Sequence, residues 1–312
     1  MTLALALLLA QAPPAPLPKK THVYKEAGGV QVHLDVHRPA DAELRPVLVW
    51  IHGGALLMGS RSGIPRNLLD LCKAEGFALV SIDYRLAPQV KLPEIIADLK
   101  DALLWVREKG PELERLDPKR LVVAGGSAGG YLTLMTGVCV EPRPNALVAY
   151  WGYGDVDGDW YTKPSEHYRK AQPLVPVEEA AKALSPDVVT APPDAAQGKA
   201  RSRYYHSLRQ AGLWTREVTG FDPGKDRARL DAFCPVRNVS PAYPPTLLVH
   251  GTEDTDVPHS LSADMARELE RHRVPHEFVS VPGAGHGLPG GDPKLVADAH
   301  ARALAFIRKH LR

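Results

Sequence analysis

Residues 121–130 read LVVAGGSAGG, an apolar run that ends abruptly in small residues around Ser127. The pattern predicts a buried strand that turns sharply into a helix, with the serine on the turn in a strained backbone conformation. Only glycine or alanine fits two positions before and after such a serine, because larger side chains would collide with the helix and the neighbouring strand. A glycine-rich turn after a core strand has the same pattern, so the role of Ser127 depends on what accompanies it.

The chain around this segment alternates between strand and helix patterns. A hairpin centred on Gly28 comes first, and the continuous apolar run of residues 45–51 then predicts a strand covered on both faces. From Pro93 onward, apolar residues recur at helical spacing. Regular alternation implies right-handed crossovers. We therefore expect an α/β fold, with a mostly parallel twisted sheet and helices on both faces.

A long segment, residues 152–243, interrupts this alternation with prolines, scattered charges and aromatic residues. Between two core strands, such a segment is either a cap over the active site or a disordered insert, and its aromatic residues favour a cap. The expected organisation is an N-terminal leader and linker (1–20), a first core part (21–151), the cap insertion (152–243) and a second core part (244–312).

Composition narrows the function classes. The chain has 312 residues, of which 44% are hydrophobic, so it can bury one large core. A formal net charge of +2, from 38 basic and 36 acidic residues, gives no reason to expect a nucleic-acid partner. Cys72, Cys139 and Cys234 are widely spaced and odd in number, which predicts packing residues rather than disulfides or a zinc site. We expect no metal and no cofactor.

The first twelve residues, MTLALALLLAQA, form an apolar run that resembles a secretory signal peptide, with Ala10-Gln11-Ala12 as the cleavage site. The run lacks a positively charged start and is followed by Pro13. It is also too short to span a bilayer, so we expect no stable membrane insertion. Two interpretations stay open: export to the periplasm or medium, or a cytoplasmic protein with an apolar tail.

The serine has suitable partners later in the chain. A serine hydroxyl is a poor nucleophile, so it needs an imidazole within hydrogen-bond reach and a carboxylate that orients the imidazole. Asp254 follows one predicted strand and His286 follows the last one, between two glycines. Loops at the carboxyl ends of parallel strands meet at one edge of the sheet. We therefore expect Ser127, Asp254 and His286 to form a catalytic triad, with Asp256, and less so Glu253, as rivals for the acid.

A third element would stabilise the negative charge that develops on the substrate oxygen. Backbone N–H groups aimed at that oxygen contribute roughly 3 kcal/mol each. Gly53 and Gly54 follow the predicted third strand and let the main chain face the substrate, while Ala128 begins the helix after the serine. Gly53, Gly54 and Ala128 are therefore the expected oxyanion hole, and His52 is expected to support this loop rather than to transfer protons.

Together these motifs resemble the α/β-hydrolase superfamily, and within it the esterases related to hormone-sensitive lipase and the feruloyl and acetyl-xylan esterase-like branch. The resemblance implies Ser127 as nucleophile, Asp254 as acid and His286 as base. The glycines and Ala128 match its oxyanion positions, and a further motif matches one that braces the sheet. The motifs are His52-Gly53-Gly54, Asp83-Tyr84-Arg85-Leu86-Ala87-Pro88, Gly125-Gly126-Ser127-Ala128-Gly129-Gly130, His250-Gly251-Thr252-Glu253-Asp254 and Gly285-His286-Gly287.

The sequence departs from this family in two places. Ala55 stands where the oxyanion motif usually has a third glycine, and the insertion lies in mid-chain, whereas the cap of the lipase relatives is largely N-terminal. We predict a carboxylesterase-type serine hydrolase that acts on a small-molecule ester through an acyl-enzyme on Ser127. The alternatives are a peptidase or amidase of the same fold, or a non-catalytic ligand-binding protein. The sequence does not determine the oligomeric state.

Overall fold

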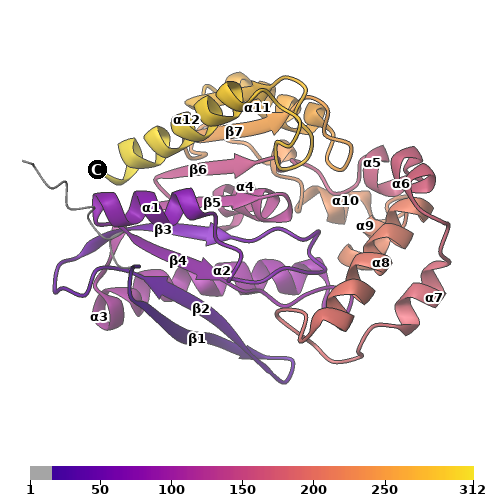
Figure 1. Ribbon diagram of the computed structural model, residues 1–312, viewed down its shortest axis with the longest axis horizontal. Helices are drawn as coiled ribbons and strands as arrows, with labels where there is room; N and C mark the ends of the chain where they lie inside the picture. Colours follow the sequence, from indigo (N-terminus) through magenta and orange to yellow (C-terminus); the bar gives the residue numbers. More distant parts are fainter. Residues whose placement is uncertain (1–15) are drawn as a thin grey trace, which may run out of the picture.

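An eight-stranded sheet runs through the centre of the computed structural model, which describes residues 16–312 (Figure 1). The strand order is β1-β2-β4-β3-β5-β6-β7-β8. The strands are β1 (Lys19–Ala27), β2 (Val30–His37), β3 (Arg45–Ile51), β4 (Ala78–Ile82), β5 (Leu116–Gly126), β6 (Ala146–Tyr150), β7 (Thr246–Gly251) and β8 (His276–Val281). From β4 to β8 all neighbours are parallel, whereas β1 pairs with β2, and β2 with β4, in the antiparallel sense. The predicted mostly parallel α/β sheet is confirmed.

Helices cover both faces of the sheet, because residues of the central strands are apolar on both sides. In β3, Val49 packs into one core and Leu48 into the other. The first core is completed by α2 (Leu92–Glu108), α4 (Ala128–Cys139) and α11 (His259–Arg271), and the second by α1 (Arg66–Glu75) and α12 (Pro293–Leu311). The short helix α3 (Gly110–Glu114) leads into β5. The carboxyl ends of the parallel strands are thereby held on a rigid, two-sided scaffold.

The insertion, residues 152–243, is helical and lies beyond the carboxyl ends of the strands (Figure 1). The sequence predicted only short helical pieces here, whereas α8 is 17 residues long. Its elements are α5 (Asp159–Thr162), α6 (Glu166–Ala171), α7 (Val177–Lys182), α8 (Ala195–Ala211), α9 (Trp214–Thr219), α10 (Arg227–Asp231) and the short 3₁₀ helix η1 (Pro235–Arg237). A helical layer therefore stands where the parallel strands end.

Two expectations concern the N-terminus and the membrane. The signal-peptide interpretation of residues 1–12 falls outside the described residues and stays a prediction. Within residues 16–312, none of the helices combines the length and apolar character needed to cross a bilayer.

Candidate active site

Ser127 occupies the sharp turn between β5 and α4. Its backbone has φ 58° and ψ −124°, a region that non-glycine residues rarely adopt. A side chain at Gly125 would place its Cβ 2.2 Å from the carbonyl oxygen of Gly129, and one at Gly129 would lie 2.0 Å from that of Ile51. The predicted requirement for small residues on both sides of the serine therefore follows from backbone atoms that cannot move away.

The structure brings the three predicted side chains into one hydrogen-bonded chain. His286 Nε2 lies 3.0 Å from Ser127 Oγ, and His286 Nδ1 lies 2.7 Å from Asp254 Oδ2. The other carboxylate oxygen, Asp254 Oδ1, accepts the backbone N–H groups of Asp256 and Val257, both at 2.9 Å. These two bonds fix the rotation of the carboxylate, which in turn directs one oxygen at the imidazole.

The electrostatic surroundings of these three side chains suit a base that is oriented by a carboxylate. Burial alone would raise the pKa of Asp254, but hydrogen bonds from His250 and His286 outweigh it and hold that pKa well below its usual range. Burial would likewise lower the pKa of His286, but the hydrogen bond to Asp254 and the charges of Asp256 and Asp254 raise it above 6.5. Asp254 therefore stays ionised, and the imidazole becomes a stronger base.

Asp256, the rival for the acid, occupies a different position. Its Oδ2 lies 3.6 Å from Nε2 of His286, the nitrogen that faces the serine. Its Oδ1 accepts hydrogen bonds from Tyr168, Tyr205 and Arg209, all in the insertion. The geometry thus places Asp254 on the orienting nitrogen and ties Asp256 to the insertion. Glu253, the lesser rival, has an exposed side chain.

Three backbone N–H groups near the serine are free to bind an oxyanion. A Cβ at Gly53 would lie 3.1 Å from that of Ser127, so this glycine is directly beside the serine. Within residues 16–312 no hydrogen bond uses the N–H of Gly53 or Gly54. Ala128 is the first residue of α4, where an N–H has no acceptor within the helix. The predicted oxyanion residues therefore offer the donors that such a site requires.

His52 supports this loop from behind, as expected. Its ring stacks on Tyr84 at 4.3 Å between centroids, and Nδ1 lies 2.8 Å from the carbonyl oxygen of Gly53. Burial lowers the pKa of His52, which keeps the ring neutral and Nδ1 as the donor. The ring thus fixes the carbonyl next to the candidate oxyanion donors, because that carbonyl cannot rotate without breaking the bond.

The loop after Gly54, where Ala55 stands in place of a third glycine, makes hydrogen bonds to the insertion. Ala55 and Leu56 have φ angles of 54° and 64°, values that favour glycine. The carbonyl of Ala55 accepts the indole N–H of Trp214 at 3.1 Å. The carbonyl of Leu57 accepts a hydrogen bond of 2.8 Å from the buried guanidinium of Arg201. The insertion therefore holds a strained loop in place beside the serine.

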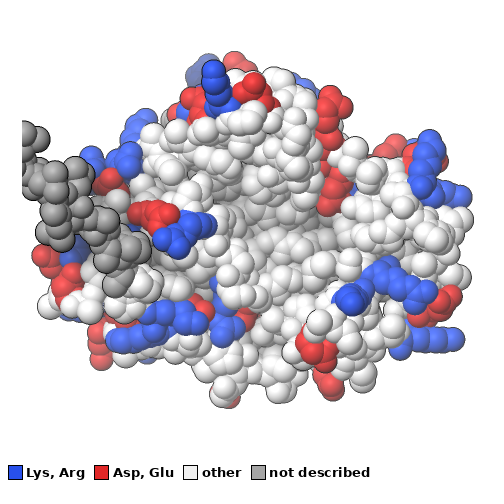
Figure 2. All heavy atoms as spheres, in the orientation of Figure 1, with Lys and Arg blue, Asp and Glu red and all other residues white. Residues whose placement is uncertain are grey.

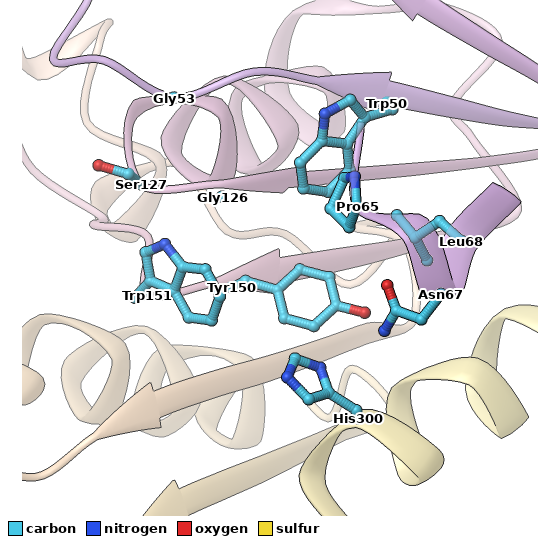
Figure 3. A pocket seen from close by; sticks show the side chains of 10 residues that line it. All are labelled: Trp50, Gly53, Pro65, Asn67, Leu68, Gly126, Ser127, Tyr150, Trp151 and His300. Atoms are coloured by element: carbon cyan, nitrogen blue, oxygen red, sulfur yellow. The ribbon is translucent and has the colours of Figure 1, made fainter. Parts of the chain in front are cut away.

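A cavity of about 220 Å³ opens at Ser127. Figure 3 shows that it extends from the serine between β3, β6 and the helices α1 and α12. In Figure 2 the middle of the displayed face is hollowed and uncharged, with charged side chains towards its edges. The residues that line the cavity were not predicted from the sequence, although aromatic residues at the ends of two strands indicate them. They comprise Trp50, Gly53, Pro65, Asn67, Leu68, Gly126, Ser127, Tyr150, Trp151 and His300.

Comparison with curated proteins gives relatives that are much longer than this chain. The chain is 27% identical over 296 residues to a non-reducing polyketide synthase of Preussia isomera, and the match covers 86% of this chain and 13% of that protein. It is 36% identical over 186 residues to a non-reducing polyketide synthase of Aspergillus calidoustus. That match covers 54% of this chain and 8% of that protein. The chain thus corresponds to a small part of the length of these relatives.

Solved structures match this chain over nearly its whole length. A protein of unknown function from Staphylococcus aureus has a TM-score of 0.73 at 19% identity, covering 95% of this chain and 100% of that one. A butyrate-bound esterase from Thermogutta terrifontis has a TM-score of 0.65 at 24% identity, covering 93% of each chain. A profile described as alpha/beta hydrolase fold matches residues 48–289. The chain therefore belongs to the α/β-hydrolase-fold family, in which its structural relatives include esterases.

Proposed function

We propose that this protein is a serine hydrolase that cleaves carboxylic esters through an acyl-enzyme on Ser127. One observation carries the proposal: a continuous chain from Ser127 Oγ through the imidazole of His286 to Asp254, with bonds of 3.0 and 2.7 Å. This arrangement can activate a serine near neutral pH. The fold shared with an esterase whose structure holds butyrate supports an ester as the substrate.

The reaction proceeds in two halves. His286 Nε2 accepts the hydroxyl proton as Ser127 Oγ attacks the ester carbonyl, and the backbone N–H groups of Gly53, Gly54 and Ala128 hold the resulting oxyanion. His286 then gives the proton to the leaving alcohol as the carbon–oxygen bond breaks. In the second half His286 takes a proton from water, the hydroxide attacks the acyl-enzyme, and the acid leaves as Ser127 regains its proton.

The insertion acts, in this proposal, as the cap of the site. Its contacts with the loops on both sides of Ser127 support that role: Trp214 bonds to Ala55 of the oxyanion loop, and Arg209 bonds to Asp256 of the acid loop. The bonds tie the geometry of the two loops to the position of the insertion. Changes in the insertion would then alter turnover as well as substrate preference.

Paired substrates test the proposal. Purified protein is assayed with p-nitrophenyl acetate and butyrate and with the matching p-nitroanilides, alongside Ser127→Ala. We expect hydrolysis of the esters that is abolished in the variant, while circular dichroism shows an unchanged fold. Wild-type turnover in Ser127→Ala would refute the nucleophile. Efficient cleavage of the anilides relative to the esters would favour an amidase, and no turnover of any substrate would favour a ligand-binding protein.

A further inference from the structure

Arg209 of α8 places a buried positive charge on the acid loop. Its side chain is only 3% exposed, and Nη1 lies 2.7 Å from Oδ1 of Asp256. Nη2 donates to the backbone carbonyl of Asp256 at 3.0 Å. Within residues 16–312, no second Asp or Glu forms an ion pair with Arg209. Because a guanidinium keeps its proton in proteins, the loop carries this charge at every pH at which the protein is folded.

Four aromatic rings of the insertion surround the guanidinium. Their centroids lie between 4.9 and 5.7 Å from its central carbon, within the range of a cation–π contact. The rings belong to Trp160, Tyr161, Tyr168 and Tyr205. The fold of the insertion therefore fixes where the charge of Arg209 lies.

The two carboxylate oxygens of Asp256 face different groups. Oδ1 accepts hydrogen bonds from Arg209, Tyr168 and Tyr205. Oδ2 accepts none from the residues that the structure describes, and it lies 3.6 Å from Nε2 of His286. One oxygen of this carboxylate is thus bound to the insertion, and the other is open towards the catalytic base.

Nε2 of His286 consequently has two oxygens close to it. Ser127 Oγ lies at 3.0 Å and Asp256 Oδ2 at 3.6 Å. In the proposed reaction, Nε2 holds the proton taken from the serine and gives it to the alcohol oxygen as the carbon–oxygen bond breaks. A carboxylate with no counter-charge at this distance would form an ion pair with the imidazolium and draw its N–H away from the alcohol.

The charges around His286 act in opposite directions. Burial lowers its pKa and so does the charge of Arg209, whereas Asp254 and Asp256 raise it. His250, the other histidine of this loop, lies 3.2 Å from Asp254. The remaining titratable groups near Asp256 are uncharged around neutral pH, because burial raises the pKa of the phenols and lowers that of the imidazole. They are Tyr161, Tyr168, Tyr205 and His206.

We propose that Arg209 is a positioning residue for proton transfer: its charge offsets that of Asp256 and keeps the Nε2–H of protonated His286 directed at the leaving alcohol. The inference rests on the proposed esterase function and assigns the insertion a part in the chemical step. Arg209 acts through Asp256 and His286, because its own polar contacts are with Asp256 and Tyr205.

The test compares two esters with the same acyl group. Ethanol leaves ethyl butyrate as a strong base that needs a proton, whereas p-nitrophenolate is a weak base that leaves without one. Titration of the released acid and absorbance give kcat/KM for the two esters, at a pH above the activity midpoint of each variant. In Arg209→Met, the ratio of kcat/KM for ethyl butyrate to that for p-nitrophenyl butyrate should fall at least about tenfold, because only the ethyl ester requires the proton.

Two further variants separate charge from packing. Arg209→Met/Asp256→Asn removes the carboxylate as well as its counter-charge, and should restore most of the ratio. Tyr168→Phe is the matched control: it removes a neutral donor to the same oxygen, Oδ1 of Asp256, and keeps the ring beside the guanidinium. It should leave the ratio unchanged. Arg209→Gln, a second neutral variant that keeps an amide donor, should behave as Arg209→Met does.

The pH profile gives an independent measurement. With Arg209 replaced by Met, the charge of Asp256 acts on His286 without opposition. The midpoint of kcat/KM for p-nitrophenyl butyrate should therefore rise by about one pH unit, the shift that a neighbouring charge typically produces. It should fall again in Arg209→Met/Asp256→Asn, and circular dichroism shows that each variant is folded.

Three results would overturn the inference. The first is an unchanged ratio in both folded neutral variants of Arg209. The second is a ratio that stays low in Arg209→Met/Asp256→Asn, since Arg209 would then only hold the loop in place. The third is an equal fall in Tyr168→Phe. All three leave hydrolysis of p-nitrophenyl butyrate by the wild type intact, whereas no hydrolysis of either ester by the wild type would refute the proposed function.

Discussion

The substitution Asp254→Asn is expected to hold the imidazole of His286 in the wrong tautomer. In the wild type, Asp254 Oδ1 accepts two backbone N–H groups, those of Asp256 and Val257, at 2.9 Å. An asparagine must keep its oxygen at that position, because an NH₂ group there would face two donors. Its NH₂ group then points at Nδ1 of His286, which must accept, so the proton moves to Nε2.

The size of the effect follows from this change. An imidazole with its proton on Nε2 cannot accept the proton of Ser127, so only the minor tautomer is active. Such a replacement in a serine triad costs about 10⁴-fold in kcat, or about 5 kcal/mol of transition-state stabilisation. Because the side chain keeps its size and its backbone bonds, the fold should persist.

Asp256→Asn is the matched comparison. Its oxygen can still accept from Tyr168, Tyr205 and Arg209, so the loop stays in place. The variant loses a negative charge that lies 3.6 Å from Nε2 of His286 and that also pairs with the buried guanidinium of Arg209. We expect kcat to fall by about tenfold at most, because a change in the basicity of His286 is only partly expressed in the rate.

Initial rates of p-nitrophenyl butyrate hydrolysis at saturating and limiting substrate give kcat and kcat/KM for both variants. Thermal unfolding monitored by circular dichroism shows whether each variant is folded. A larger loss in Asp256→Asn than in Asp254→Asn would transfer the role of the acid to residue 256 and refute the reasoning. Equal losses would mean that neither carboxylate orients the base alone.

Two further predictions follow from the same geometry. Since burial of His286 is outweighed by the neighbouring carboxylates, its pKa lies above 6.5. Activity should therefore fall as the pH drops through a midpoint above 6.5, and Asp256→Asn should move that midpoint to lower pH; a pH profile of kcat/KM that shifts upward would contradict this. Gly129→Ala places a Cβ 2.0 Å from the carbonyl oxygen of Ile51, and should cost about 3 kcal/mol of unfolding free energy and most activity. In the control Gly198→Ala the new methyl group meets nothing closer than 3.9 Å, and denaturant titration of both variants should show a loss of stability only at residue 129.

Local sequence was sufficient to predict the centre of the site. The glycines around Ser127 are required by backbone contacts within a few residues and a neighbouring strand, so the motif carries its own geometry. Asp254 and His286 follow parallel strands, whose ends meet at one edge in any such sheet. The order of these three residues along the chain therefore predicted their meeting in space.

The sequence favoured Asp254 as the acid but left Asp256 as a rival. Asp254 and Asp256 lie on one loop, and the direction of each side chain depends on the loop conformation and on its partners. One is directed by backbone N–H groups, the other by Arg209 of the insertion. The full extent of α8 was missed for a related reason. Its buried residues include Arg201 and Gln210, so its buried face shows no apolar periodicity.

The cavity at Ser127 could not be predicted from the sequence, because its walls come from distant segments. Tyr150 ends a strand and His300 lies in the last helix, and neither has a motif of its own. Only the packing of α1 and α12 against one face of the sheet places them together. Sequence patterns predict such elements but not the space that is left between their side chains.

The central claim is that Ser127 is a nucleophile activated by His286. A fluorophosphonate probe reacts with such serines, and mass spectrometry of the digested protein locates the adduct. We predict stoichiometric labelling of the peptide that contains Ser127, and none in Ser127→Ala or after His286→Ala. Labelling at another residue, or no labelling of the folded wild-type protein, would contradict the account.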